Sequence, residues 1–188
     1  MRIITGLYKG RTILTVRDFS VRPATDRVRQ TIFNMLANRI PMEGARVLDL
    51  FAGSGSLGLE ALSRGAAYVT FVEQGEEAAG CIEQNARSFG CEGRTEILTM
   101  DAMSYLVPGR GPFDLVFADP PYEFDRTPDI PGLLFDYSLL RPGGYLLIEH
   151  ANDHSFDSTP SFTAGPQKKF GRTIVTFFRP TMTRSREQ

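Results

Sequence analysis

The chain has 188 residues, of which 41% are hydrophobic and 23% are charged, and this composition is typical of one globular domain. Its apolar runs are much shorter than the ~20 residues that cross a bilayer, and its first residues lack the apolar core of a signal peptide. These features argue against a membrane-spanning or secreted protein. We therefore expect a cytoplasmic location.

Cysteine and histidine form no metal-binding pattern. Cys81 and Cys91 lack a C-x-x-C partner, and His150 and His154 are the only two histidines. We expect free thiols in a reducing compartment and no bound metal.

The net charge of −1 conceals an uneven distribution along the chain. Residues 1–46 carry nine basic and three acidic side chains, whereas residues 47–163 carry six basic and eighteen acidic ones. Residues 164–188 are basic again, with six basic side chains and one acidic. Basic ends around an acidic body suggest that a polyanion is held by the ends. An ordinary solvated surface is the alternative, and charge alone does not decide between them.

The first segment, residues 1–42, differs from the rest and is assigned to a small basic extension. Residues 2–14, "RIITGLYKGRTIL", have a β-like composition interrupted by Gly6 and Gly10. This pattern is consistent with a short β-hairpin.

A helix is predicted next, over residues 25–36. Its apolar side chains recur at the helical period, at Val28, Ile32, Met35 and Leu36. Thr25 or Asp26 can cap the helix. Arg27 and Arg29 lie near its start, where a phosphate can also meet free backbone N–H groups. A solvated helix face is the alternative for either arginine.

From residue 46 onward, strand and helix patterns alternate. Strands are expected at 46–51, 67–73, 94–100, 114–119 and 144–150, and helices at 56–65 and 76–90. This alternation predicts right-handed βαβ units and a doubly wound α/β fold with a mostly parallel sheet.

The end of the chain predicts an antiparallel element. The strand at 144–150 follows a turn with the sequence "RPGG", and a late strand is expected at 173–178. The intervening "QKKFGRT" (167–173) is typical of a turn, so the last two strands are expected to form an antiparallel hairpin. We assign residues 43–180 to the α/β domain and residues 181–188 to a flexible tail.

A glycine-rich turn, "AGSG", lies directly between the first strand of the sheet and its helix. Gly53 and Gly55 allow a sharp turn and a close approach to a ligand. The spacing does not match the full G-x-G-x-x-G fingerprint, and alone it is a weak signal. Asp49, within the preceding strand, strengthens it, because burying an unpaired carboxylate is costly. This carboxylate can orient the glycine turn or accept from a cationic ligand.

Two further acids follow the next two strands. Glu73 ends the second strand, where an acid can accept both ribose hydroxyls, and Asp101 follows the third, where it can receive an adenine amino group beside Ala102. Surface loop residues are the alternative for each acid singly. Together the acids indicate a nucleoside ligand, and the lack of a basic residue in the glycine turn favours S-adenosylmethionine over NAD or ATP.

The fourth strand ends at Asp119-Pro120-Pro121-Tyr122, on the same edge of the sheet. An exocyclic amino group of a base is a poor nucleophile, because its lone pair is delocalised into the ring. A carboxylate at Asp119 and the carbonyl of Pro120 can accept its two N–H bonds and draw the nitrogen towards tetrahedral geometry. Pro121 stiffens the corner, and Tyr122 can stack on a flipped base. A simple turn that ends the strand is the alternative.

These motifs resemble those of two groups of known proteins. "LDLFAGSG" and "ADPPY" resemble the class I S-adenosylmethionine-dependent amino-methyltransferases. "RIITGLYKGRTI", "RPATDRVRQTIFNML" and "GLEALSRGA" are similar to the bacterial 16S ribosomal RNA guanine-N2 methyltransferase family. The resemblance implies a Rossmann-like sheet of seven strands, a methyl transfer to the 2-amino group of a guanine in 16S ribosomal RNA, and a monomer that needs no metal.

The resemblance also implies roles for individual residues. The implied cofactor contacts are Asp49, Phe51, Gly53, Ser54, Gly55, Glu73, Asp101 and Ala102. The implied base contacts are Asp119, Pro120, Pro121 and Tyr122, and the candidate RNA contacts are Lys9, Arg11, Arg22 and Arg27. One departure concerns residues 123–137, where prolines interrupt a segment that is often a longer helix, and this difference affects the expected shape of the substrate pocket and not the expected reaction.

Other substrates and functions stay open at this stage. The D-P-P-Y corner is shared by methylases of adenine or cytosine in DNA, of other RNAs and of protein glutamine. A DNA methylase normally needs a further recognition domain, and protein glutamine methylases resemble one another in an Asn at the position of Asp119. A non-catalytic RNA-binding protein that retains the cofactor fold is the alternative outside the enzymes.

Overall fold

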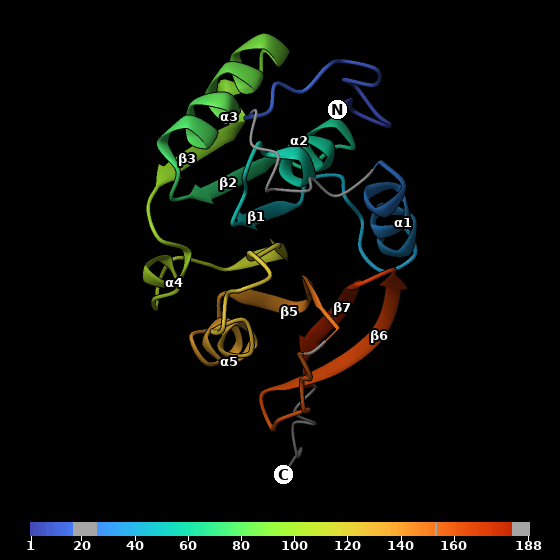
Figure 1. The fold of residues 1–188 in the computed structure, drawn as a ribbon, viewed down its shortest axis with the longest axis vertical. Helices are drawn as coiled ribbons and strands as arrows, with labels where there is room; N and C mark the ends of the chain where they lie inside the picture. Colours follow the sequence, from blue (N-terminus) through green and yellow to red (C-terminus); the bar gives the residue numbers. More distant parts are fainter. Residues whose placement is uncertain (17–25, 153, 182–188) are drawn as a thin grey trace.

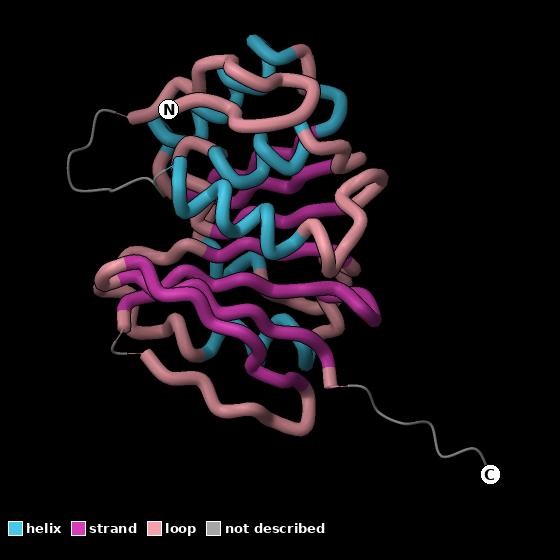
Figure 2. Tube along the Cα trace, turned by 90° about the vertical axis from the view of Figure 1, so that its right-hand side faces the viewer, coloured by secondary structure: helices cyan, strands magenta, loops and turns pink. Residues whose placement is uncertain are grey.

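Seven strands form one twisted sheet in this computed structural model, which describes residues 1–16, 26–152 and 154–181 (Figures 1 and 2). The strands are β1 (Arg46–Leu50), β2 (Tyr68–Glu73), β3 (Thr95–Thr99), β4 (Phe113–Ala118), β5 (Leu140–Ala151), β6 (Phe162–Phe170) and β7 (Thr173–Pro180). They lie in the order β3-β2-β1-β4-β5-β7-β6. β1 to β5 are mutually parallel, and β7 runs antiparallel to both of its neighbours.

Helices cover both faces of the sheet. They are α1 (Asp26–Leu36), α2 (Ser56–Ser63), α3 (Glu76–Phe89), α4 (Ala102–Tyr105) and α5 (Asp129–Asp136), with a 3-10 turn at Glu92–Arg94. Apolar side chains of α1, α2 and α3 form one core with the sheet, and those of α4 and α5 form a second core on the other face. The predicted doubly wound α/β fold is therefore confirmed, with strands that are buried on both sides as parallel strands require.

Two details at the end of the chain differ from the sequence predictions. The "RPGG" segment lies inside β5, where a register shift against β4 accommodates it, and does not form a separate turn. Residues 167–170 belong to β6, and only Gly171 and Arg172 turn the chain into β7. The antiparallel hairpin is thus β6–β7, and it packs against β5 through β7.

The N-terminal extension packs closely on the rest of the chain. An antiparallel bridge joins Arg2 to Thr12, and Ile3, Tyr8 and Ile13 are buried in the same core as α1 and α2. The predicted helix is present as α1, while the proposed cap Thr25 lies outside the described residues. The same holds for residues 182–188 of the expected tail.

The proline-rich segment after the Asp119 corner does form a helix, α5. Pro131 is its third residue, and a proline is tolerated in a first turn because the N–H that it lacks would have no partner within the helix. Ile130 and Leu134 of α5 are fully buried against the sheet.

Three further observations concern the described part of the chain. Cys81 and Cys91 are both free and buried, as expected. No helix there combines the length and the apolar character needed to span a bilayer. No group of three His, Cys, Asp or Glu side chains there is arranged to hold a metal ion.

Candidate active site

The glycine turn between β1 and α2 has an unusual backbone. Gly53 and Gly55 have φ values of 55° and 77°, in the left-handed region where glycine is favoured. Phe51 also has a positive φ, 57°, which strains a residue with a side chain. Its ring meets that of Phe124 edge-on at 5.1 Å, and this contact links the turn to the segment after Asp119.

Asp49 stabilises the connection between this turn and α2 through a hydrogen bond. Its side chain is 2% exposed, and Oδ2 accepts the N–H of Gly58, in the first turn of α2, at 2.9 Å. Burial raises the pKa of Asp49 to about 8, the bond from Gly58 opposes that rise, and the nearby Glu73 adds to it. Of its two predicted roles, orienting the turn is the one that has a visible contact.

Glu73, at the end of β2, also holds the turn. One carboxylate oxygen accepts the N–H of Gly53 and the other accepts the N–H of Gly75, each at 2.8 Å. An ionised carboxylate has about four acceptor positions, so two remain for ligand hydroxyls. The carboxylate is thereby fixed in place at the edge of the sheet.

Asp101 directly precedes α4, and its side chain caps that helix. Oδ1 accepts both the N–H and the hydroxyl of Ser104, at 2.8 and 2.9 Å, while the residue itself is exposed. Ala102, the first residue of α4, is buried beside it. The turn, Glu73 and Asp101 therefore line one edge of the sheet, where the carboxyl ends of β1, β2 and β3 lie.

The corner at Asp119 lies on the same edge, one strand away from the glycine turn. The N–H of Asp119 donates to the carbonyl of Leu50 at 3.4 Å, which joins the ends of β4 and β1. Within the described residues, neither the carboxylate of Asp119 nor the carbonyl of Pro120 has a hydrogen-bond partner. Both acceptors are therefore available to one amino group. Burial, followed by Glu149 and Asp49, raises the pKa of Asp119 well above its usual range.

Glu149 also lies at this site, although it was not among the residues predicted from the sequence. β5 pairs with β4 so that Ile148 faces Ala118, and Glu149 therefore stands next to Asp119. Burial raises the pKa of Glu149 to about 7, and its Oε2 is buried without a partner among the described residues. Its only sequence signal was an acid in the middle of an apolar strand.

Tyr122 is held from a distant part of the chain. Its hydroxyl is hydrogen-bonded to the hydroxyl of Thr173, the first residue of β7, while 52% of Tyr122 is exposed. Pro120 is buried and Pro121 is exposed, so the corner presents one proline to the core and one to solvent. The ring of Tyr122 is thus fixed at its tip and accessible elsewhere.

A buried amide connects the N-terminal extension to the glycine turn. The side chain of Asn85, on α3, accepts the N–H of Leu14 at 2.7 Å and donates to the carbonyls of Leu14 and Ser54 at 2.9 and 3.3 Å. The backbone of Ser54 in the glycine turn is thus tied to α3. Asn85 was not among the predicted site residues, because in the sequence it is one polar residue in a helix.

The candidate RNA contacts are spread over the extension. Lys9 and Arg11 are exposed, and Arg11 donates to the carbonyl of Ser88, near the carboxyl end of α3, at 3.1 Å. Arg27 is exposed near the start of α1, and Arg22 lies outside the described residues. No hydrogen bond or ion pair among the described residues joins Lys9, Arg11 or Arg27 to the Asp119 corner.

Arg29, which the sequence places near a possible phosphate, is fully buried. Its guanidinium donates to Asp26 at 3.0 Å and to the carbonyl of Arg2, and it lies 3.9 Å from Glu60 of α2. Glu60 also accepts from Arg64. Arg29 is therefore part of the packing between the extension and α2 and is not available to RNA.

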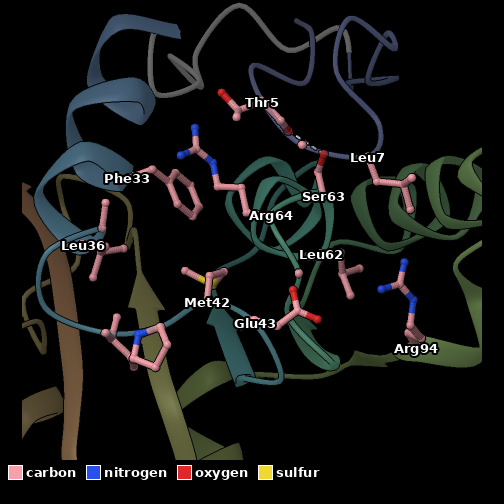
Figure 3. A pocket seen from close by; sticks show the side chains of 15 residues that line it. Thr5, Leu7, Phe33, Leu36, Met42, Glu43, Leu62, Ser63, Arg64 and Arg94 are labelled. Carbon is pink, nitrogen blue, oxygen red and sulfur yellow. Dashed lines mark hydrogen bonds between the residues drawn. The ribbon is translucent and has the colours of Figure 1, made fainter.

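A surface hollow of about 650 Å³ lies elsewhere (Figure 3). Leu36, Met42, Ser63 and Arg64 are among its lining residues. α2 begins beside the glycine turn and ends at this hollow, so the hollow and the candidate site lie at opposite ends of one helix.

The architecture and the site together define the class of protein. A sheet ordered β3-β2-β1-β4-β5-β7-β6, with β7 alone antiparallel, is the Rossmann-like fold expected of class I S-adenosylmethionine-dependent methyltransferases. Its glycine turn and acids lie at the carboxyl edge, where open α/β sheets bind ligands. The fold is that of a methyltransferase.

Comparison with known proteins identifies the family. The family model described as "Conserved hypothetical protein 95" matches residues 1–179, and the chain belongs to this family. It is 35% identical to the ribosomal RNA small subunit methyltransferase D of Haemophilus influenzae, over 91% of this chain and 89% of that protein. It is 33% identical to YlbH of Bacillus subtilis, by name a candidate rRNA methyltransferase, over 95% and 98% of the two chains.

Solved structures agree with this assignment. A structure from Escherichia coli, by name the candidate methyltransferase yhhF, superposes with a TM-score of 0.84 at 32% identity. It covers 96% of this chain and 97% of its own. The expected fold class and family are both confirmed.

Proposed function

We propose that the chain transfers a methyl group from S-adenosylmethionine to the exocyclic 2-amino group of a guanine in 16S ribosomal RNA. The names of its relatives support the ribosomal substrate. The observation that carries the reaction is the corner at Asp119, beside the glycine turn, where a carboxylate and the carbonyl of Pro120 have no hydrogen-bond partner among the described residues. Ribosomal RNA is made and modified in the cytoplasm, where we expect the protein to act.

The chemistry of the site suits a cationic nucleoside. Asp49, Glu73, Asp119 and Glu149 lie at the ends of neighbouring strands, and no Lys or Arg forms an ion pair with any of them within the described residues. When bound, S-adenosylmethionine supplies an electrophilic methyl group on a sulfonium. Glu73 would hold the ribose hydroxyls, and Asp101 and Ala102 would hold the adenine. A cation beside these carboxylates lowers the pKa values that burial has raised.

Asp119 and Pro120 act on the amino group. By accepting its two N–H bonds, they hold the nitrogen in a geometry in which its lone pair points away from the ring. Fixed acceptors of this kind stabilise the positive charge that develops on nitrogen, and they need no reorganisation during the reaction.

Glu149 is suited to take the proton by way of Asp119. The amino nitrogen, once it had accepted the methyl group that S-adenosylmethionine would supply, would have to lose one proton, and Asp119, which accepts one of its N–H bonds, could pass that proton to the neighbouring Glu149. A carboxylate with a pKa of about 7 next to Asp119 is suited to receive it near neutral pH.

Access to this edge requires that the guanine leave its stack. The flipped base would lie against the exposed ring of Tyr122, a contact of ~1–3 kcal/mol. The surrounding RNA would meet basic residues outside the pocket, for which Lys9, Arg11, Arg22 and Arg27 stay candidates.

The test is transfer of a labelled methyl group. Small ribosomal subunits, their RNA, duplex DNA and bulk protein are each incubated with labelled S-adenosylmethionine and the purified chain. Label on the 2-amino group of a guanine in the small-subunit RNA is expected. Label confined to DNA or protein would overturn the proposal, and so would the absence of S-adenosylmethionine binding by calorimetry. Gel filtration of the same sample checks the expected monomer.

A further inference from the structure

The β6–β7 hairpin brings a distant part of the sequence to the reactive edge of the sheet. Because β7 is antiparallel to β5, its first residue, Thr173, pairs with Ala151 at the carboxyl end of β5. The turn at Gly171 and Arg172 therefore lies on the edge that carries Asp119. Figure 1 shows β6 and β7 side by side at the end of the sheet beyond β5.

Thr173 touches the candidate site directly. It is 8% exposed, and its hydroxyl is bonded to that of Tyr122, 51 positions earlier in the chain. A tyrosine anchored at its hydroxyl cannot swing freely about χ1, yet 52% of Tyr122 stays exposed. The hairpin thus holds in place the ring on which a flipped base would stack.

The charged side chains of the hairpin are all positive. Residues 162–180 contain four basic side chains and no acidic one. Three of them, Lys168, Lys169 and Arg172, lie at or next to the turn, and all three are exposed and form no ion pair with a described residue. Arg179 lies near the other end of the hairpin, where it pairs with Thr163.

Protection of an exposed edge is another use for lysines on β6, because lysine discourages pairing between sheets. Such protection is needed along the whole strand. Residues 162–166 of β6 carry no charge at all, and the two lysines of β6 lie only at the end of the strand beside Tyr122. Its position indicates an anion at the reactive edge.

We propose that the tip of the β6–β7 hairpin, residues 167–173, holds the target RNA strand beside the flipped base. Lys168, Lys169 and Arg172 bind phosphates next to the methylated nucleotide, and Thr173 positions Tyr122 against the base. The proposal rests on the proposed function and extends it, because the sequence had placed the RNA contacts in residues 1–42.

The first experiment measures RNA affinity as a function of salt. The variant K168Q/K169Q/R172Q is compared with R179Q, which removes one charge from the far end of the same hairpin. Each phosphate contact with a single strand contributes about 0.7 to the slope of log K against log salt, so the triple variant should lose up to about 2 from that slope. Its kcat/KM should fall at least about tenfold, mainly through KM, whereas R179Q should match the wild type.

The second experiment tests the link between Thr173 and Tyr122. T173V and Y122F should each lower kcat/KM about five- to tenfold, and the double variant should be no worse than either single one, because both remove the same bond. T173S restores the hydroxyl and should recover most of the loss. S-adenosylmethionine affinity by calorimetry, which a general loss of structure would weaken, should not change.

The outcomes distinguish a failure of the hairpin proposal from a failure of the proposed function. RNA affinity and its salt slope report on the hairpin even if no methyl group is transferred. If the wild type methylates ribosomal RNA but the triple variant keeps its slope and affinity, the hairpin proposal is overturned and the proposed function stands. Strictly additive losses for T173V and Y122F would overturn the positioning role of Thr173.

Discussion

Asp119 and Glu149 stand side by side with raised pKa values, and this closeness is the main electrostatic feature of the site. Two buried carboxylates on adjacent strands repel one another when both are ionised, so one proton tends to be shared between them. Removing either carboxylate should therefore relieve repulsion and leave the fold intact. Function, and not stability, explains why such a pair is present.

We expect D119A to lower the rate of methyl transfer by ~10²–10³-fold, the usual effect of removing one fixed group that stabilises developing charge. The matched control is E123A, which removes an exposed carboxylate four positions along the chain. Single-turnover rates measure the effect, and calorimetry checks that S-adenosylmethionine still binds D119A. A rate for D119A near that of E123A would exclude its role in activating the amine.

Glu149 leads to a prediction about pH. It must be ionised to accept a proton, and its pKa is about 7 in the cofactor-free protein, so kcat/KM for S-adenosylmethionine, which reports on the free enzyme, should rise as the pH increases through about 7 and then level off. E149Q should lose this dependence and transfer more slowly at all pH values. The pH profile of kcat/KM from about pH 5.5 to about 8.5 measures both effects. A profile for E149Q that still rises through pH 7 would assign the dependence to another group.

Asp49 leads to a prediction about stability. In the folded protein the carboxyl of Asp49 stays protonated up to a pH of about 8, whereas in the unfolded chain it loses its proton near pH 4. The free energy of unfolding therefore falls as the pH rises between these values. D49N cannot ionise, and its side-chain oxygen can still accept the N–H of Gly58. The melting temperature of D49N minus that of the cofactor-free wild type should therefore increase as the pH rises from about 5 to about 8. Thermal unfolding at several pH values measures the gap, and a constant gap would contradict the shifted pKa.

At the scale of elements, two helical glycines should respond oppositely to alanine. A Cβ on Gly58 of α2 would lie 2.3 Å from the Phe71 ring, so G58A should cost ~1–3 kcal/mol by overpacking. A Cβ on Gly80 of α3 would meet nothing within 4 Å, so G80A should gain up to ~1 kcal/mol from helix propensity. Urea unfolding measures both changes. If G58A and G80A changed the free energy of unfolding equally, α2 would have to move away from β2 to make room for the new Cβ.

The elements with a regular apolar period were predictable from the sequence, and β6 was not. Residues 164–169 of β6 lie on an exposed edge with a register shift and contain a glycine and a proline, so they show no alternation of apolar and polar residues. The "RPGG" segment was misread for a related reason. Its turn-forming residues fit a bulge inside β5, and only the partner strand reveals that pairing continues.

At the scale of the whole molecule, strand order decides which site residues can be recognised. The glycine turn, Glu73 and Asp101 lie at or directly after strand ends, so the sequence alone could propose them as site residues. Glu149 and Thr173 join the site only because β5 lies beside β4 and β7 runs back along β5. No local pattern encodes that order, so these contacts between distant residues could not be predicted.

The same reasoning applies to the N-terminal extension. Glu60 of α2 is fully buried and accepts the N–H groups of Ile4 and Thr5 at 2.7 and 3.0 Å, while Arg29 of α1 lies beside it. The sequence suggested a basic appendage that ends at residue 42. The contacts of Glu60 make the extension a structural part of the α/β domain, because buried charges that lose their partners are strongly destabilising.

Deleting residues 1–42 should therefore prevent cooperative folding. The deletion would uncover the core side chains that pack against Ile3, Tyr8 and α1, and it would leave Glu60 without the two N–H groups and the guanidinium that surround it. We expect the shortened chain to show no sharp thermal transition and to bind a hydrophobic dye such as ANS. If it instead unfolds cooperatively near the wild-type melting temperature and binds S-adenosylmethionine, the extension is a separate unit attached to a methyltransferase that is complete without it.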